Sequence, residues 1–312
     1  MAKSVRVRFA PSPTGHMHVG NLWVAFLSYW SARHQDGEYI VRIEDVDTQR
    51  SKPIYAEHIL EDLSWLGFTW DEAPTYQSER LDIYERYLQE LHSQKRLYPC
   101  YCNRARLQEI SSAPHQGEAN HVYDGYCLTH EPTIGERPPS WRFHMENIKG
   151  SFLDIYRGTI DYEIQSCNDD IVLKRWDGMI AYHLAVVIDD YEMGVTEVVR
   201  GNDLLPVTGH QIALAQALGF PSLQYGHAPM LVDAEGYRLS KRQQSITIRD
   251  LQNQGATPER LWAWFALETG LLTKGDLPLS GHIGLSELLE ITIPKKLLKQ
   301  DTIKLTNFDI MV

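Results

Sequence analysis

The chain has 312 residues with 41 acidic against 30 Lys and Arg side chains, a formal net charge of −11. This balance excludes a protein that holds nucleic acid over its whole surface, because such binding needs many surface cations, so any RNA partner would need a local patch. Four cysteines are too few for a disulfide framework, and no apolar run approaches the roughly 20 residues of a membrane-spanning helix, so we expect a cytoplasmic protein without membrane contact.

Strand-like and helix-like periodicities alternate along the chain, which predicts an α/β fold. The first predicted elements are a strand at 5–9, a helix at Leu22, Phe26 and Tyr29, a strand at 39–43, and helices at 54–66 and 81–91. Residues 98–139 break into Cys, Gly, His and Pro, as an inserted irregular module would. Later elements are a β-rich stretch at 152–164, strands at 181–188, 196–199 and 227–233, and helices at 207–218, 258–267 and 286–290.

A loop rich in Pro and Gly joins the first strand to the first helix, with the sequence RFAPSPTGHMHVGN (8–21). In open α/β sheets ligands bind beyond the carboxyl ends of the strands, where helix N-termini face phosphates. His16 and His18 can donate hydrogen bonds to phosphate, and Gly20 allows a close approach of a ligand. The segment is neither a GxGxxG nor a P-loop motif, and its spacing alone leaves open that the histidines are merely solvated.

A second candidate is RLSKR (238–242), in which Lys241 follows the small hydroxyl residue Ser240. A lysine in such a loop can neutralise charge that develops on a transferring phosphoryl group. Taken alone, a short basic run is more often solvated surface.

In this order, HVGN (18–21) and RLSKR (238–242) resemble the HIGH and KMSKS motifs of class I aminoacyl-tRNA synthetases. The blocks RFAPSPTG (8–15), VRIEDVDTQR (41–50), AYHLAVVIDD (181–190) and VVRGND (198–203) are similar to those of the glutamyl enzymes. The chain departs from HIGH at Asn21, and from KMSKS at Arg238, Leu239 and Arg242.

The resemblance implies a Rossmann-type catalytic domain in which the carboxylate of L-glutamate attacks the α-phosphorus of ATP to give glutamyl-adenylate. It implies catalytic roles for His16, His18 and Lys241, and Mg²⁺ that arrives with the ATP. The residues expected to bind ATP are His16, His18, Gly20, Asn21, Ser240 and Lys241.

Glutamate carries two carboxylates and an ammonium group, so its pocket needs separated cations and an anion. Arg8 and Arg200 can each bind a carboxylate with a forked guanidinium, and Glu44 can bind the ammonium group. Tyr182 offers a hydroxyl. A plain ion pair or a core tyrosine is the alternative for each. The full predicted glutamate set is Arg8, Phe9, Ala10, Pro11, Ser12, Glu44, Tyr182 and Arg200.

Three cysteines, Cys100, Cys102 and Cys127, lie close together in the sequence and suggest a metal rather than a disulfide. Zinc prefers four tetrahedral ligands, and chemistry alone nominates a histidine as the fourth. The candidates are His121, His115 and His130, whereas Cys167 is expected to be a buried small apolar residue. Cysteines without metal are the alternative.

The CxC…YxxxC pattern is similar to the zinc insert of glutamyl-queuosine tRNA(Asp) synthetases, where the tyrosine is a ligand. This resemblance implies a structural Zn²⁺ held by Cys100, Cys102, Tyr123 and Cys127, so Tyr123 is preferred to His121.

The 71 residues after Lys241 are too few for the helical anticodon-binding region of full glutamyl enzymes. The resemblance therefore implies glutamate activation without tRNA and transfer to the queuosine base in the anticodon of tRNA(Asp), by a monomer. The alternatives are a truncated glutamyl-tRNA synthetase that charges a 3′ end, and a non-catalytic regulator that binds tRNA or glutamate. The expected division is a first catalytic half at 1–97, a zinc-bearing insert at 98–165, a second half at 166–242 and a short helical part at 243–312.

Overall fold

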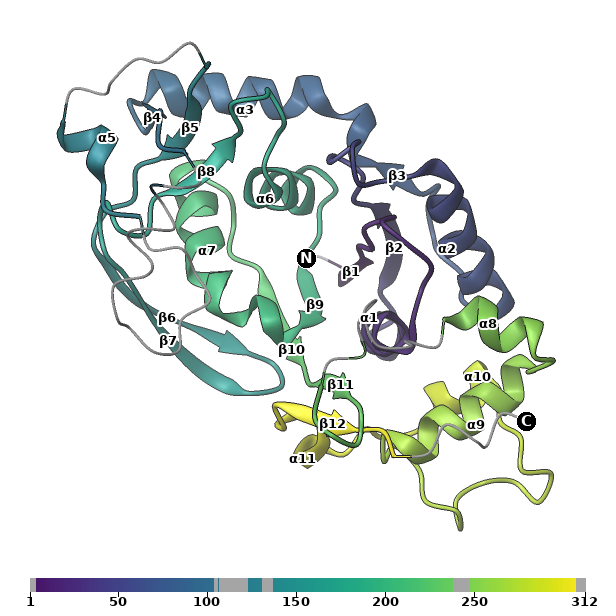
Figure 1. Ribbon diagram of the computed structural model, residues 1–312. Coiled ribbons are helices and arrows are strands. Elements are labelled where there is room, and N and C mark those ends of the chain that lie inside the picture. Colours follow the sequence, from purple (N-terminus) through teal and green to yellow (C-terminus); the bar gives the residue numbers. More distant parts are fainter. Residues whose placement is uncertain are drawn as a thin grey trace.

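A seven-stranded sheet forms the centre of the molecule in this computed structural model, which describes residues 4–103, 106, 123–130, 137–237, 239 and 247–306 (Figure 1). Neighbouring strands are parallel except β6 and β7, which form an antiparallel hairpin at one edge. In sheet order the strands are β3 (Thr75–Tyr76), β2 (Glu38–Ile43), β1 (Arg6–Phe9), β9 (Glu197–Gly201), β10 (Gln224–Ala228), β6 (Ile148–Asp154) and β7 (Gly158–Ile164).

Helices cover both faces of this sheet (Figure 1). Alternate residues of β2 serve the two faces: Val41 and Ile43 pack into the core formed with α1 and α2, whereas Ile40 packs with Val198 on the opposite side. A sheet buried on both faces needs such continuous apolar strands. On one face lie α1 (Val19–His34) and α2 (Pro53–Trp65), and on the other lie α6 (Tyr182–Glu192) and α7 (Thr208–Ala217). The helix α3 (Leu81–Ser93) packs against α6.

The prediction of a strand at 181–188 is wrong, because these residues belong to the helix α6, which begins at Tyr182 and ends at Glu192. The cause is burial on nearly every side: all residues from Leu184 to Asp190 are buried. A helix enclosed in this way has a continuous apolar run instead of a 3.6-residue period, and such a run cannot be distinguished from a buried strand. The helices predicted at 54–66, 81–91, 207–218 and 258–267 are confirmed by α2, α3, α7 and α9 (Pro258–Glu268).

A separate three-stranded sheet consists of β4 (Leu97–Cys100), β5 (Ser140–Phe143) and β8 (Ile171–Lys174). Cys100 pairs with Ser140 and Trp141 with Lys174, so the end of β4, the start of β5 and the end of β8 meet at one edge. The short helix α5 (Tyr126–Thr129) contacts β4 there. The hairpin β6–β7 falls within the segment 98–165 but belongs to the central sheet.

The last described part of the chain is mainly helical and packs against α1. Trp262 and Phe265 of α9 contact Phe26 of α1, with ring centroids 5.7 and 6.3 Å away, and the Trp262 indole donates to the carbonyl of Leu66. No helix among the described residues has the length and apolar character needed to cross a bilayer. The remaining elements are β11 (Met230–Val232), paired with β12 (Thr302–Lys304), two 3₁₀ turns, η1 (Gln77–Glu79) and η2 (Asn202–Val207), and the helices α8 (Ile248–Asn253), α10 (Leu285–Leu289) and α11 (Lys295–Leu298).

Candidate active site

A cavity of about 580 Å³ opens at the carboxyl ends of β1 and β9. The chain order of the strands reverses between these two neighbours, and α/β sheets bind ligands at such a switch point. The cavity brings together every predicted glutamate residue and four of the predicted ATP residues. The lining includes Arg8, Phe9, Ala10, Pro11, Ser12, His16, His18, Gly20, Asn21, Glu44, Tyr182 and Arg200.

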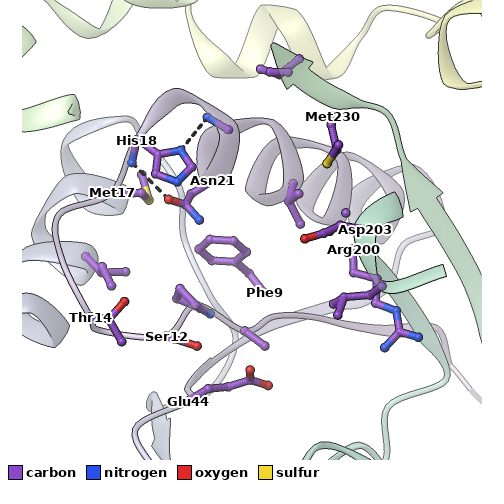
Figure 2. A pocket seen from close by; sticks show the side chains of 18 of the residues that line it. Phe9, Ser12, Thr14, Met17, His18, Asn21, Glu44, Arg200, Asp203 and Met230 are labelled. Atoms are coloured by element: carbon purple, nitrogen blue, oxygen red, sulfur yellow. Dashed lines mark hydrogen bonds between the residues drawn. The ribbon is translucent and has the colours of Figure 1, made fainter. Parts of the chain in front are cut away.

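His18 is the N-cap of α1, and its ring has a defined orientation. The backbone N–H of Gly20 donates to His18 Nδ1 at 3.1 Å, and Asn21 Oδ1 accepts from the His18 backbone N–H at 3.2 Å (Figure 2). Because Nδ1 accepts, a neutral His18 ring carries its proton on Nε2, which can serve as a hydrogen-bond donor. The departure from HIGH at Asn21 therefore completes a capping box.

Gly20 has a steric role that its sequence position did not reveal. A Cβ atom at this position would lie 2.9 Å from Cε1 of His18. Glycine thus leaves room for the imidazole in its capping position, besides keeping this turn of the helix open to a ligand.

His16 stacks on His58 of α2, a residue that the sequence analysis missed. Their ring centroids are 5.0 Å apart and their Nδ1 atoms 3.3 Å apart. Burial lowers the pKa of His16, and the nearby His58 lowers it further, so His16 is neutral at neutral pH. As a lone histidine within a helical period, His58 gave no sequence signal.

The segment that carries Ser240 and Lys241 lies outside the described residues, but both of its ends lie at the cavity. Leu239 lines the cavity, and Thr247 forms a bridge pair with His18. The predicted contributions of Ser240 and Lys241 therefore stay predictions.

Arg8 belongs to a buried charge network at the base of the cavity. Its Nε atom contacts Asp190 at 3.0 Å, and Arg42 contacts the same carboxylate oxygen at 2.7 Å and Glu44 at 3.2 Å. Burial alone would raise the pKa of Asp190, but the charges of Arg8 and Arg42 outweigh it and lower the pKa. Burial raises the pKa of Glu44, an effect that Arg42 and Arg8 reduce without cancelling. Two arginines and two carboxylates therefore hold one another in place at the base of the cavity.

Arg200 is held by neutral partners. Its guanidinium donates to Gln211 Oε1 at 2.6 Å, to Thr208 Oγ1 at 2.8 Å and to His227 Nε2 at 3.1 Å. These partners orient the group without cancelling its positive charge, which stays available to a carboxylate. Sequence analysis missed all three, because they follow in two later elements and belong to no recognised block.

The cavity therefore has two chemically different ends. Figure 2 shows Glu44 and Arg200 on one side and His18 and Asn21 on the other, with Phe9 between them. One end can hold an amino acid by its carboxylate and ammonium groups, and the other offers a helix N-terminus and an imidazole to phosphate. This is an arrangement for joining a carboxylate to a nucleotide phosphate.

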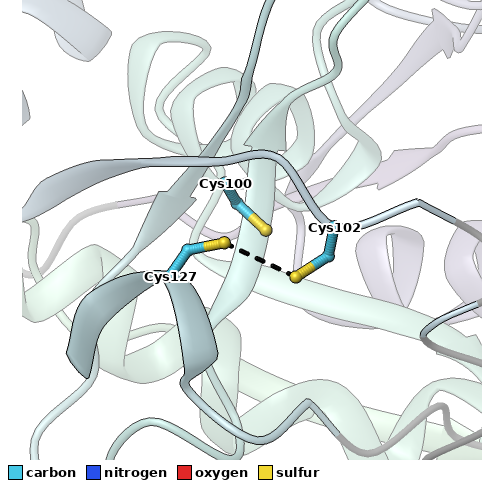
Figure 3. A group of neighbouring side chains, drawn as sticks. All are labelled: Cys100, Cys102 and Cys127. Carbon is cyan, nitrogen blue, oxygen red and sulfur yellow. Dashed lines mark hydrogen bonds between the residues drawn. The ribbon is translucent and has the colours of Figure 1, made fainter. Parts of the chain in front are cut away.

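A second candidate site contains the three clustered cysteines. The Sγ atoms of Cys100, Cys102 and Cys127 lie within 4.8 Å of one another, at the end of β4, in the loop that follows and on α5 (Figure 3). The Cys102 and Cys127 sulfurs are 3.5 Å apart. Tetrahedral zinc with Zn–S bonds of about 2.3 Å needs sulfurs roughly 3.8 Å apart, so the cluster fits zinc.

Tyr123 is the one predicted fourth ligand found beside these thiols among the described residues. Its hydroxyl lies 3.8 Å from Cys100 Sγ and accepts from the backbone N–H of Cys127 at 3.0 Å. His130 instead stacks on the ring of Tyr126, whereas His115 and His121 lie outside the described residues.

The pKa values of Cys100 and Cys102 are shifted in opposite directions. Burial alone would raise the pKa of Cys100, but Arg142, whose Nε atom donates to its sulfur at 3.3 Å, lowers it. Burial raises the pKa of Cys102 to about 12, and the neighbouring Cys100 adds to that rise. A bound cation would relieve this crowding of thiols.

A further group with metal-ligand chemistry is His144, Cys167 and Asp170. Its carboxylate already accepts from the Tyr98 hydroxyl at 2.7 Å and the Met145 backbone N–H at 2.7 Å, so its buried position is explained by structure alone. Cys167 is half-buried, not the buried residue that the sequence predicted.

The family model described as tRNA synthetases class I (E and Q), catalytic domain, matches residues 4–305. A protein of Nitratidesulfovibrio vulgaris named glutamyl-Q tRNA(Asp) synthetase is 42% identical over 86% of this chain and 87% of its own length. A protein of Symbiobacterium thermophilum with the same name is 42% identical over 85% of this chain and 86% of its own length.

Two further comparisons concern glutamate–tRNA ligases. That of Coprothermobacter proteolyticus is 40% identical over 84% of this chain, which covers 58% of that relative. The crystal structure of the Elizabethkingia meningosepticum glutamate tRNA ligase, in complex with its amino acid, superposes with a TM-score of 0.78 at 29% identity, covering 99% of this chain and 68% of that one.

Proposed function

The chain belongs to the family of class I tRNA synthetase (E and Q) catalytic domains and is a glutamate-activating ligase, and on this premise we propose that it transfers glutamate to the queuosine base in the anticodon of tRNA(Asp). The observation that carries the chemistry is one cavity that holds Arg8, Glu44 and Arg200 at one end and His18 at the other.

In the proposed first step, Arg8 and Arg200 each bind a glutamate carboxylate and Glu44 binds the ammonium group. A carboxylate oxygen bonds to the α-phosphorus of ATP while the bond from that phosphorus to the bridging oxygen of pyrophosphate breaks. His18, through Nε2–H, and His16 bind phosphate oxygens, and Lys241 neutralises charge on the phosphorus centre. The cap hydrogen bonds of His18 support this role, since they fix the ring before ATP binds.

In the second step a hydroxyl of queuosine attacks the acyl carbon of glutamyl-adenylate. The new ester bond forms as the acyl–phosphate bond breaks, the hydroxyl proton leaves, and AMP is released. The 42% sequence identity with two proteins named glutamyl-Q tRNA(Asp) synthetase, over most of their length, supports this acceptor.

Two metal ions belong to the proposal. Mg²⁺ would bind with ATP through phosphate oxygens and water. The residues that would hold Zn²⁺ are Cys100, Cys102, Cys127 and Tyr123, and the ion would tie β4 to α5 without taking part in the chemistry.

Glutamate-dependent exchange of pyrophosphate into ATP, in the absence of any tRNA, tests activation directly. We expect exchange with glutamate but not with glutamine or aspartate, and its loss in Lys241→Ala. A chain that binds glutamate but never exchanges pyrophosphate would be a non-catalytic regulator. Exchange that needs tRNA(Glu) would instead favour a truncated enzyme that charges a 3′ end.

A further inference from the structure

Trp176 is exposed to an unusual degree for a tryptophan of this chain. It lies in the loop between β8 and α6, with 44% of its surface exposed, whereas the other seven tryptophans are buried or half-buried. A single exposed apolar side chain is ordinary on a protein surface and needs a second observation before it indicates a site.

That observation is Arg137, which lies beside the indole. Its guanidinium carbon is 5.3 Å from the centroid of a Trp176 ring, and its Nη2 atom donates to the carbonyl oxygens of Cys102 at 3.0 Å and Tyr101 at 3.4 Å. These carbonyl partners fix the guanidinium, and within the described part of the chain no carboxylate is paired with it. The neighbouring Arg175, by contrast, is paired with Asp177 at 2.6 Å.

Along the chain, Trp176 lies between the small sheet, which carries Cys100 at the end of β4, and α6, which begins at the cavity. Trp176 follows the end of β8, at the same edge of the small sheet as Cys100 and Ser140. From there the chain passes through Ile180, which pairs back to Lys174, into α6, whose first residue Tyr182 lines the cavity. Trp176 therefore belongs to the segment that joins β8 to α6, and Figure 1 shows how these two elements are connected.

We propose that Trp176 and Arg137 bind an unpaired nucleobase of the RNA acceptor, with the base stacked on the indole and Arg137 facing the adjoining phosphate. Unpaired bases are recognised in this way by an exposed aromatic ring next to a cation. The inference deepens the proposed function, on which it rests for the RNA nature of the acceptor. It also supplies the local cation that a chain with a net charge of −11 needs.

The test measures the dissociation constants of two fluorescent RNAs, the queuosine-containing anticodon stem-loop of tRNA(Asp) and whole tRNA(Glu). Trp176→Ala should weaken binding about tenfold, the loss of one stacked base. Trp176→Tyr keeps an aromatic face and should retain most of the affinity, and Arg137→Gln should weaken binding and flatten its salt dependence. Tyr191→Ala, which removes another exposed aromatic (42%), is the matched control.

Glutamate-dependent pyrophosphate exchange should be unchanged in Trp176→Ala, because Trp176 does not line the cavity in which glutamate is activated. Unchanged affinity in Trp176→Ala, or equal losses in Trp176→Ala and Trp176→Tyr, would overturn the stacking role. If the wild-type protein binds tRNA(Glu) and not the stem-loop, the proposed acceptor is contradicted. The effect of Trp176→Ala and Trp176→Tyr is then measured on tRNA(Glu), so the stacking role is still tested. A chain that binds neither RNA would overturn both proposals.

Discussion

The ring of His227 accepts a hydrogen bond from Arg200 at Nε2, 3.1 Å away, while its Nδ1 contacts the Asp154 carboxylate at 2.6 Å. Burial lowers the pKa of His227, and the hydrogen bond to Asp154 only partly opposes this, so the ring is neutral. A neutral ring that gives Nδ1–H to Asp154 presents a lone pair at Nε2. The histidine thus positions a guanidinium in the cavity without neutralising it.

Replacing His227 should therefore impair glutamate binding selectively. In His227→Phe the Arg200 Nε–H loses its acceptor, and we expect the KM for glutamate to rise about tenfold, the worth of one hydrogen bond to a charged group. The KM for ATP should be unchanged, as measured by pyrophosphate exchange. The exposed His92 serves as control through His92→Phe. Equal rises in both KM values would indicate general damage instead of a positioning role.

The carboxylate of Asp190 should be essential to stability. Asp190→Asn removes the charge that compensates the buried guanidinium groups of Arg8 and Arg42. We expect the free energy of unfolding to fall by about 3–5 kcal/mol in urea titrations. The exposed pair of Arg6 and Glu38 is the comparison, because Glu38→Gln should cost less than about 1 kcal/mol. Similar costs for the two variants would contradict the buried network.

The raised pKa of Glu44 predicts that activity and stability change in opposite directions with pH. Burial raises its pKa above the ordinary value of 4.5, and the ammonium group binds only the ionised form. As pH falls through this raised pKa, kcat/KM for glutamate should fall. Over the same window the folded state binds more protons than the unfolded state, so the free energy of unfolding should rise as pH falls.

Glu44→Gln isolates these two effects. The variant should have a much lower kcat/KM for glutamate, and the part of both pH profiles that belongs to Glu44 should disappear from the difference between wild type and variant. If the difference between wild type and Glu44→Gln does not change across acidic pH, in either kcat/KM or the free energy of unfolding, then Glu44 does not titrate in this window.

The phenol of Tyr123 should contribute to metal retention. If it is a zinc ligand, Tyr123→Phe should release zinc to a chromogenic chelator at lower chelator concentrations than wild type, and Cys102→Ala should not retain zinc. Tyr84→Phe removes another buried phenol, which hydrogen-bonds to Asp189 of α6, and should leave zinc binding unchanged. Protein purified without added chelator and containing no zinc would refute the metal site.

The cavity residues that could be predicted from the sequence are those in the first loop and at the ends of strands. Arg8, His18, Glu44 and Arg200 lie at the carboxyl ends of strands or at a helix start, where α/β topology places ligand groups. Their supports were beyond prediction, because His227 and Asp154 meet only through the pairing of β10 with β6. The buried run in α6 was misread for the same reason: enclosure by the rest of the fold removes the local period.

The most direct test of the central claim locates the glutamate on the RNA. The protein is incubated with ATP and labelled glutamate, and with tRNA(Asp) containing queuosine, tRNA(Asp) lacking it, or tRNA(Glu). Each RNA is then digested to nucleosides and analysed by mass spectrometry. We predict labelled glutamate on the queuosine nucleoside of the first RNA and none on the other two. Labelled glutamate on a terminal adenosine, with queuosine unmodified, would contradict the account.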